Sequence, residues 1–142
     1  MPSVTRLETV ADLRERADPR EMSVGARHEA VLGDGRRVTL LDDRGWTSTL
    51  YGPGVDAETD AWQLASEREI EEAARAVVGP DEPFGDRTQA DMERDHWNWL
   101  ADKLGSEGVA VDADELRRLP HDVVLSARLR ARLGRTELHG PA

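Results

Sequence analysis

The dipeptide Asp34-Gly35 is the feature that most constrains how this chain folds. Asp and Gly at the corners of a two-residue turn favour a β-hairpin, because such turns need positive φ at both positions. Strand geometry then places Val31, Val38 and Leu40 on one face of the hairpin, and His28, Ala30, Thr39 and Leu41 on the other. A two-residue turn here pairs Leu32 with Arg37, and this pairing sets the expected register of the whole hairpin.

A second turn signal lies at residues 43–45 and precedes residues 46–51, which are rich in β-branched and aromatic side chains. We therefore expect residues 28–51 to form three antiparallel strands. A sheet of three strands is about the smallest that is stable once helices cover one face.

Apolar residues at helical spacing predict helices before and after these strands in the chain. The segment before Pro19 begins ambiguously, as a short edge strand or as a helix that continues to Asp18. Further helices are expected at residues 57–78, 88–104, 112–119 and 121–134. The predicted fold class is α+β, a small three-stranded antiparallel meander followed by and packed against four or five helices.

The length of 142 residues predicts a single globular domain over residues 1–142, with a frayed tail at about 136–142. The chain has no cysteine, which excludes disulfides and thiolate metal sites. No signal peptide and no apolar run of membrane-spanning length is visible. We therefore expect a cytoplasmic protein that does not contact a membrane.

Charge is distributed unevenly along the chain, whose net charge is −10. Residues 56–115 carry 18 acidic and 5 basic side chains. Such a surface repels phosphate backbones, so nucleic acid is not expected as a partner. It instead favours a protein partner with a basic surface. The alternative interpretation is that the acidity only keeps the protein soluble.

Two tryptophans, Trp97 and Trp99, lie about 200° apart on one predicted helix, so both cannot face the same core. An exposed tryptophan is a typical anchor for a protein partner. The alternative is that neighbouring helices bury both indoles. With the acidic face of helix 57–78 and the loop 79–87, the predicted binding residues are Glu67, Glu69, Glu71, Glu72, Phe84, Trp97 and Trp99.

Histidines supply the only candidates for catalysis, and each has a carboxylate nearby in sequence. Glu93-x-x-His96 is half of a di-metal carboxylate motif, but no second half follows on a helix. No metal and no cofactor are therefore expected. His121 and Asp122 adjoin at a predicted helix start, where a histidine suits a general base. If the protein is an enzyme, at least two of His28, His96 and His121 should converge in one pocket with an acid in reach.

The leading hypothesis is a small acidic intracellular protein-binding module that is not an enzyme, of the inhibitor, immunity or adaptor kind. Its size and acidity are similar to those of immunity proteins that mask basic toxins, a similarity of bulk properties that rests on no motif. The first alternative is a small hydrolase or isomerase that uses a histidine–carboxylate pair. The second is an obligate homodimeric structural protein, in which the tryptophans and the long helix form the self-interface.

Overall fold

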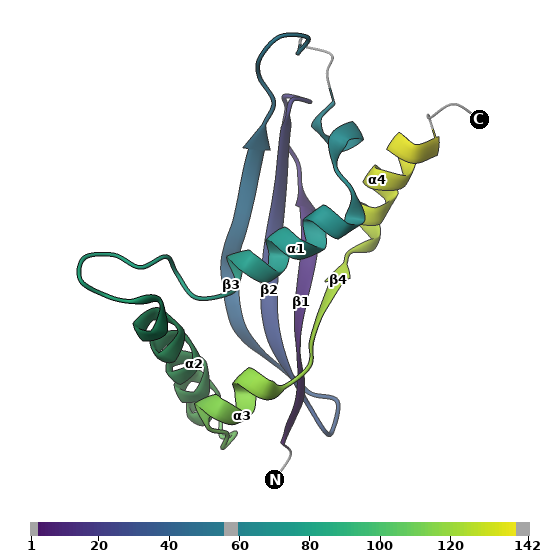
Figure 1. Ribbon diagram of the computed structural model, residues 1–142. Helices are drawn as coiled ribbons and strands as arrows, with labels where there is room; N and C mark the ends of the chain where they lie inside the picture. The colour runs from purple at the N-terminus through teal and green to yellow at the C-terminus, as the bar shows by residue number, and fades with distance from the viewer. Residues whose placement is uncertain (1–2, 56–59, 139–142) are drawn as a thin grey trace.

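The protein folds as a four-stranded sheet with helices on one face, as a computed structural model shows for residues 3–55 and 60–138 (Figure 1). In chain order its elements are β1 (Val4–Arg14), β2 (Glu21–Leu32), β3 (Arg37–Thr49), the 3₁₀ helix η1 (Ala61–Leu64), α1 (Glu67–Val77), α2 (Gln89–Ser106), α3 (Ala113–Arg118), β4 (His121–Leu125) and α4 (Ala127–Leu138).

The strand order across the sheet is β3-β2-β1-β4. β1, β2 and β3 are antiparallel neighbours, whereas β4 lies parallel to β1. The α+β class is therefore confirmed, but the predicted three-stranded antiparallel meander is wrong, because the sheet is mixed and has four strands. The predicted tail at residues 136–142 falls partly outside the described residues.

β1 is a strand, although its sequence also fitted a helix. Its buried residues Leu7, Thr9, Ala11 and Leu13 recur every second position, the period of a strand with one covered face. The Thr9-x-x-Asp12 pattern is typical of a helix cap, but here Asp12 binds a residue far away in the chain. The Asp12 carboxylate accepts a 2.6 Å hydrogen bond from the Ser126 hydroxyl and so fixes the start of α4 against β1.

The hairpin predicted at Asp34-Gly35 is confirmed, but its register differs by one residue. The loop has three residues, 33–35, and is closed by a 2.8 Å bond from the Leu32 amide to the Arg36 carbonyl. Only Gly35 in this loop has a positive φ, of 90°. A three-residue loop with glycine in the left-handed position replaces the expected two-residue turn. Arg37 consequently pairs with Val31 instead of Leu32.

β3 runs straight through residues 43–45, where a turn was expected. Gly45 instead pairs with Gly25 on β2, and the Arg14 side chain lies across both glycines. A Cβ atom at Gly45 would lie 2.5 Å from the Val24 carbonyl oxygen and 2.8 Å from Arg14 Nη1. Glycine at position 45 thus reflects close packing on the face of the sheet that lacks helices, not a change of chain direction.

Two of the predicted helices are also divided differently. Of the helix predicted at residues 57–78, positions 57–59 lie outside the described residues. The rest does not form one helix: Ser66 caps a new one by accepting a hydrogen bond from the Glu69 amide, so η1 and α1 are separate. Residues 121–134 divide into β4 and α4, since the β-branched Val123 and Val124 extend a strand beside β1. The helix predicted at residues 88–104 is confirmed as α2, which begins at a capping box in which Thr88 and Asp91 bond reciprocally.

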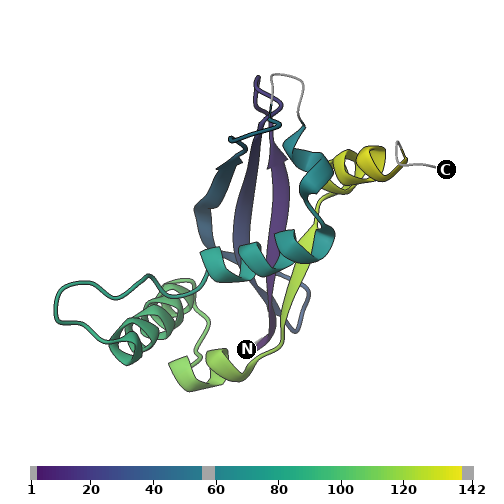
Figure 2. The same cartoon turned by 45° about the horizontal axis from the view of Figure 1, so that its top comes forward.

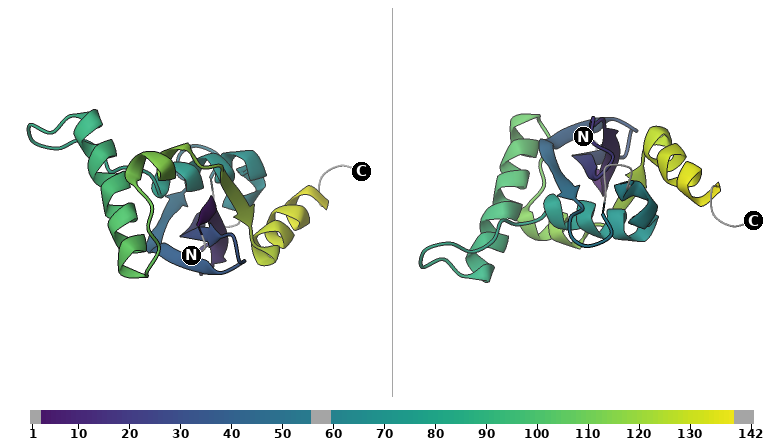
Figure 3. Two further views of the ribbon diagram at one scale, coloured as in Figure 1. Left: turned by 90° about the horizontal axis from the view of Figure 1, so that it is seen from below. Right: turned by 90° about the horizontal axis from the view of Figure 1, so that it is seen from above.

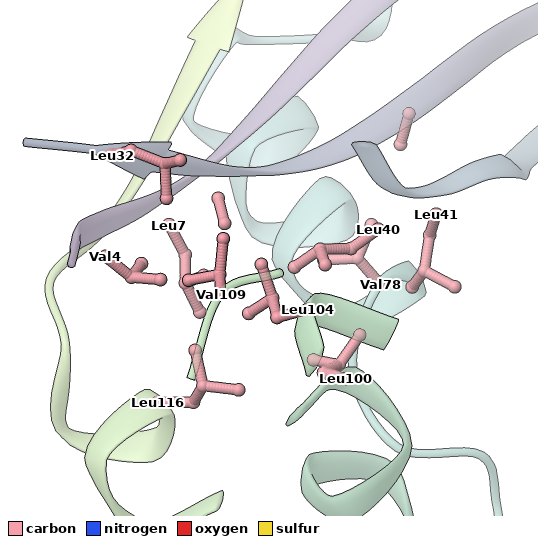
Figure 4. Packing of buried hydrophobic residues seen from close by; sticks show 12 residues of the cluster. Val4, Leu7, Leu32, Leu40, Leu41, Val78, Leu100, Leu104, Val109 and Leu116 are labelled. Atoms are coloured by element: carbon pink, nitrogen blue, oxygen red, sulfur yellow. The ribbon is translucent and has the colours of Figure 1, made fainter. Parts of the chain in front are cut away.

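The helices form two apolar cores on one face of the sheet (Figures 2 and 3). In the first, α2, α3 and the end of α1 cover the part of the sheet drawn lower in Figure 1 (Figure 4). In the second, α1, η1 and α4 cover the other part, around the buried Trp62. The face without helices carries ion pairs instead. There Arg37 bonds Glu8 at 2.6 Å and lowers the pKa of that carboxyl.

Candidate functional site

A cleft of about 480 Å³ lies between β3 and α2. We call it the β3–α2 cleft. Its walls come from residues of β3, from one stripe of α2 and from the loop between α1 and α2. These wall residues are Leu40, Leu41, Asp42, Asp43, Arg44, Asp81, Met92, Asp95, His96, Trp99 and Lys103.

The cleft follows the free edge of the sheet. Five consecutive residues of β3, 40–44, line it. The pairing of β3 with β2 shifts register twice here, between Ala26 and His28 and between His28 and Glu29, so neighbouring side chains of 40–44 do not alternate strictly between the two faces. A second hollow, of about 330 Å³, continues along the same edge past residues 37–40 and reaches Lys103 and Glu107. β3 is the last strand of the sheet on this side.

Trp99 lies on the wall of the cleft with 51% of its surface exposed. Trp97, two residues earlier, is partly buried and packs on the first core, with its ring 5.1 Å from that of His96. The expected division between a packed and an exposed indole is what the structure has, and Trp99 is the exposed one. Leu40 and Met92, both buried, form the apolar floor beside it.

Two ion pairs fix the ends of the loop between α1 and α2. Arg44 on β3 binds Asp81 at 3.1 Å near the start of the loop. Arg87 near its end is paired with Asp95 on α2. Phe84 lies between these two anchored ends and is 65% exposed. The loop therefore presents an aromatic ring to solvent next to the cleft, on a segment that is held at both ends.

Glu93 and His96, one of the two candidate catalytic pairs, do not act together. Glu93 is paired with Arg117 of α3 at 3.5 Å. His96 lines the cleft, where burial lowers its pKa, helped by the charge of Arg44 and opposed by that of Asp81. His96 is therefore neutral at neutral pH and offers the cleft a hydrogen-bonding group without charge.

His121 and Asp122, the other candidate pair, point to opposite faces of the sheet because they are neighbours on β4. The expectation of a helix start at this position is wrong, and with it the proximity of the two side chains. His121 turns to the helix-covered face, where its Nε2 lies 2.6 Å from the Thr9 hydroxyl. The same hydroxyl lies 2.9 Å from Nδ1 of His28.

The enzyme alternative required two of the histidines to converge in a pocket with an acid in reach; His28 and His121 converge, but their surroundings differ from that arrangement. Thr9 and His28 are 0% and 1% exposed, so substrate cannot reach them in this conformation. Burial lowers the pKa of His28 to about 3, and the nearby His121 and His96 contribute to this shift. Among the described residues no carboxylate hydrogen-bonds to either ring, and the third partner is Thr9. Once β1 is known to be a strand, the signal that identifies Thr9 is its position as a polar residue between Leu7 and Ala11 on the buried face.

The four predicted binding glutamates lie on α1, away from the cleft. Glu67, Glu69 and Glu72 are exposed and Glu71 is half-buried. Glu72 forms an ion pair with Arg68 one turn earlier, at 3.1 Å. None of the four lines the β3–α2 cleft. The structure thus groups Trp99 with aspartates of β3, α2 and the loop, which the sequence had not connected with it.

The described part of the chain holds no cluster of three histidine, cysteine or acidic side chains arranged to hold a metal ion. None of its helices combines the length and the apolar character that a membrane crossing requires. Comparison with known proteins gives no family, since no family model, no curated protein sequence and no solved structure matches this chain.

Proposed function

We propose that this chain is a protein-binding module and that a partner with a basic surface docks at the β3–α2 cleft. The observation that carries the proposal is the half-exposed Trp99 on the wall of that cleft. Large aromatic side chains that stay exposed next to a hollow are the usual anchors of protein interfaces. The exposed Phe84 on the neighbouring loop adds a second aromatic contact.

The charges around the cleft support a basic partner. Asp42, Asp43, Asp81 and Asp95 line it, against Arg44 and Lys103. Arg44 is already engaged with Asp81, whereas Asp42 has no ion-pair partner among the described residues. The net charge of −10 for the whole chain attracts a cationic protein at long range and speeds its encounter.

Affinity capture from the source cell at low salt tests the proposal. The captured protein is then purified, and its affinity is measured for the wild-type chain and for two variants. Trp99→Ala should weaken binding at least tenfold, because it removes the anchor. Tyr51→Ala is the matched control, since Tyr51 is an exposed aromatic, 83% accessible, that does not line the cleft.

The dependence of the affinity on salt concentration is a second test of the same complex. Binding to a basic partner should weaken as the salt concentration rises through the physiological range. The proposal fails if no protein is captured, or if the affinity of the captured protein depends neither on Trp99 nor on salt. A complex weakened only by Glu67→Lys and Glu69→Lys would move the docking surface to α1.

A further inference from the structure

We propose that the β3–α2 cleft binds an extended, lysine- or arginine-bearing segment of its partner, which pairs with β3 as a fifth strand. This inference rests on the proposed function and specifies the conformation and chemistry of what is bound. Addition of a strand to a free sheet edge is a recurrent mode of peptide recognition, in which backbone bonds give affinity and side-chain pockets give specificity.

The backbone of β3 is free on its outer side. Among the described residues, the backbone of 38–43 forms hydrogen bonds only within the ladder with β2. The ladder between β3 and β2 has two register irregularities, between Ala26 and His28 and between His28 and Glu29 of β2. In the regular parts of an edge strand, every second residue points its N–H and C=O groups outward, where they can bond another chain. The two hollows that follow this edge show that no other part of the described chain fills the space beside it.

α2 gives the edge a second wall and so makes it a groove. Met92, His96, Trp99 and Lys103 recur at helical spacing and face β3 across the cleft. Figure 3 shows α2 alongside the β3 side of the sheet in both views. The edge from residue 37 to residue 44 spans about 25 Å, at roughly 3.3 Å per residue, enough for a segment of seven or eight residues.

The chemistry of the groove identifies the occupant. Its lining combines two buried apolar residues, Leu40 and Met92, with acidic side chains. The acidic side chains are Asp42 and Asp43 on β3 and Glu107 at the far end of the groove. The side chains of an added strand point alternately to opposite sides. A segment that alternates apolar and basic residues therefore places an apolar side chain against Trp99 and its cations against the aspartates.

A second copy of this chain fits the groove less well. Two β3 edges paired about a two-fold axis near residues 42–43 would bring Asp42 and Asp43 of both copies together, and like charges opposite each other destabilise a sheet. α2 lies beside this edge and crosses the strand direction obliquely, since Figure 3 draws the strands foreshortened and α2 lengthwise, so the helix restricts the space that the sheet of a second copy would need. We therefore assign the site to a segment of another protein.

Selection of linear twelve-residue peptides from a displayed library, against the full chain, supplies a probe. We expect the selected peptides to carry lysine or arginine at alternate positions. Amide hydrogen exchange with the tightest peptide should slow at least tenfold at residues 38–44. Methylation of alternate backbone nitrogens in that peptide should weaken binding at least tenfold, because a methylated nitrogen donates no hydrogen bond.

Variants of the protein locate the contact without disturbing the sheet. Asp42→Lys and Asp43→Lys, both at exposed positions, should weaken the peptide at least fivefold. Glu67→Lys with Glu69→Lys on α1 is the matched charge reversal and should leave the affinity unchanged. The strand inference is overturned if backbone methylation does not change the affinity of the selected peptide, or if the peptide slows amide exchange in other segments. The proposal of a protein-binding module would then still be tested by the capture experiment.

Two further results also overturn the inference. One is that no peptide is selected, which means that the edge accepts no extended segment. The other is a dimer in light scattering whose β3 amides are protected without peptide, which assigns the edge to a second copy. If one of these results is found and Trp99→Ala still abolishes capture of the partner protein, the docking site at the cleft stands. Only the proposal that its occupant is an extended segment is then rejected.

Discussion

The imidazole rings of His28 and His121 meet edge to face in the core, with their centroids 5.0 Å apart, although 92 residues separate them in the chain. One hydroxyl, that of Thr9, hydrogen-bonds to both rings. Three strands, β1, β2 and β4, each contribute one of these side chains. The contact therefore exists only after β4 has joined the sheet beside β1.

This pair predicts a loss of stability in mild acid. The pKa of His28 is about 3 in the folded protein, against 6.5 for a free histidine. Below pH 6.5 the unfolded chain binds a proton that the folded chain does not, so stability falls as the pH falls toward 3. The slope from His28 alone is about 1.4 kcal/mol per pH unit.

Urea denaturation at several pH values between 7 and 5 measures this slope, above the range in which the carboxylates titrate. Burial also lowers the pKa values of His121 and His96, against a partial opposing effect of Asp122 and Asp81, so both add to the slope. Within this range His28→Gln should be less sensitive to pH than the wild type. Equal slopes in the two proteins would show that His28 is not held neutral by the fold.

Removal of the shared hydroxyl should destabilise the protein without creating a cavity. Thr9→Val keeps the volume but leaves Nδ1 of His28 and Nε2 of His121 without their partner. The free energy of unfolding should fall by about 1–3 kcal/mol. Thr49→Val, at an exposed position on β3, is the control and should change it by less than about 0.5 kcal/mol. A Thr9→Val variant as stable as the control would remove the hydroxyl's assigned role.

Gly25 and Gly45, which pair across β2 and β3 beside the Arg14 side chain, should differ in how much stability an alanine substitution costs. A Cβ atom at Gly45 meets the Val24 carbonyl at 2.5 Å, and backbone cannot easily move aside. A Cβ atom at Gly25 meets Arg14 Nε at 2.8 Å, at the far end of a flexible side chain. Gly45→Ala should therefore cost about 1–3 kcal/mol and Gly25→Ala distinctly less.

Thermal unfolding of the two glycine variants gives the comparison directly. Addition of Arg14→Ala should restore Gly25→Ala, because it removes the clashing side chain, but should not restore Gly45→Ala. The packing described for this face of the sheet is wrong if both variants respond alike to the loss of Arg14.

The two neighbouring tryptophans should differ in their contribution to stability. Trp97→Ala removes an indole that packs on the first core and should lower the free energy of unfolding by about 2–4 kcal/mol. Trp99→Ala removes a side chain that is half exposed and should cost clearly less, about 1 kcal/mol or below. Urea titrations followed by circular dichroism measure both. A Trp99→Ala variant as unstable as Trp97→Ala would mean that Trp99 is a core residue, not a free anchor.

Local signals in the sequence were sufficient where one short segment decides the outcome. The Thr88–Asp91 capping box starts α2, and Asp34-Gly35 turns the chain between β2 and β3. The opposite placement of Trp97 and Trp99 follows from helix geometry alone. Of the candidate site, the sequence offered an exposed tryptophan on α2 as one of two alternatives, without deciding between Trp97 and Trp99, and it placed the acidic binding face on α1 instead of at the cleft.

Local signals failed where the structure of a segment depends on contacts with a segment distant in the chain. Residues 4–14 and 121–125 both fit helical patterns, yet each becomes a strand because the other lies beside it. Asp12 is read as a helix cap within its own segment, but it is Ser126 that it binds. The β3–α2 cleft could not be predicted from the sequence either, because it requires both that β3 ends the sheet and that α2 packs beside that edge.

By itself, the sequence determined that the chain turns at Asp34-Gly35, where α2 begins and the excess of negative charge, since each can be read without long-range contacts. Only the tertiary structure decided that β4 completes a mixed sheet, that Thr9 joins two histidines, and that β3 keeps a free edge beside Trp99. The physical reason is that parallel pairing and burial depend on which surfaces meet after long loops close. No window of neighbouring residues contains that information.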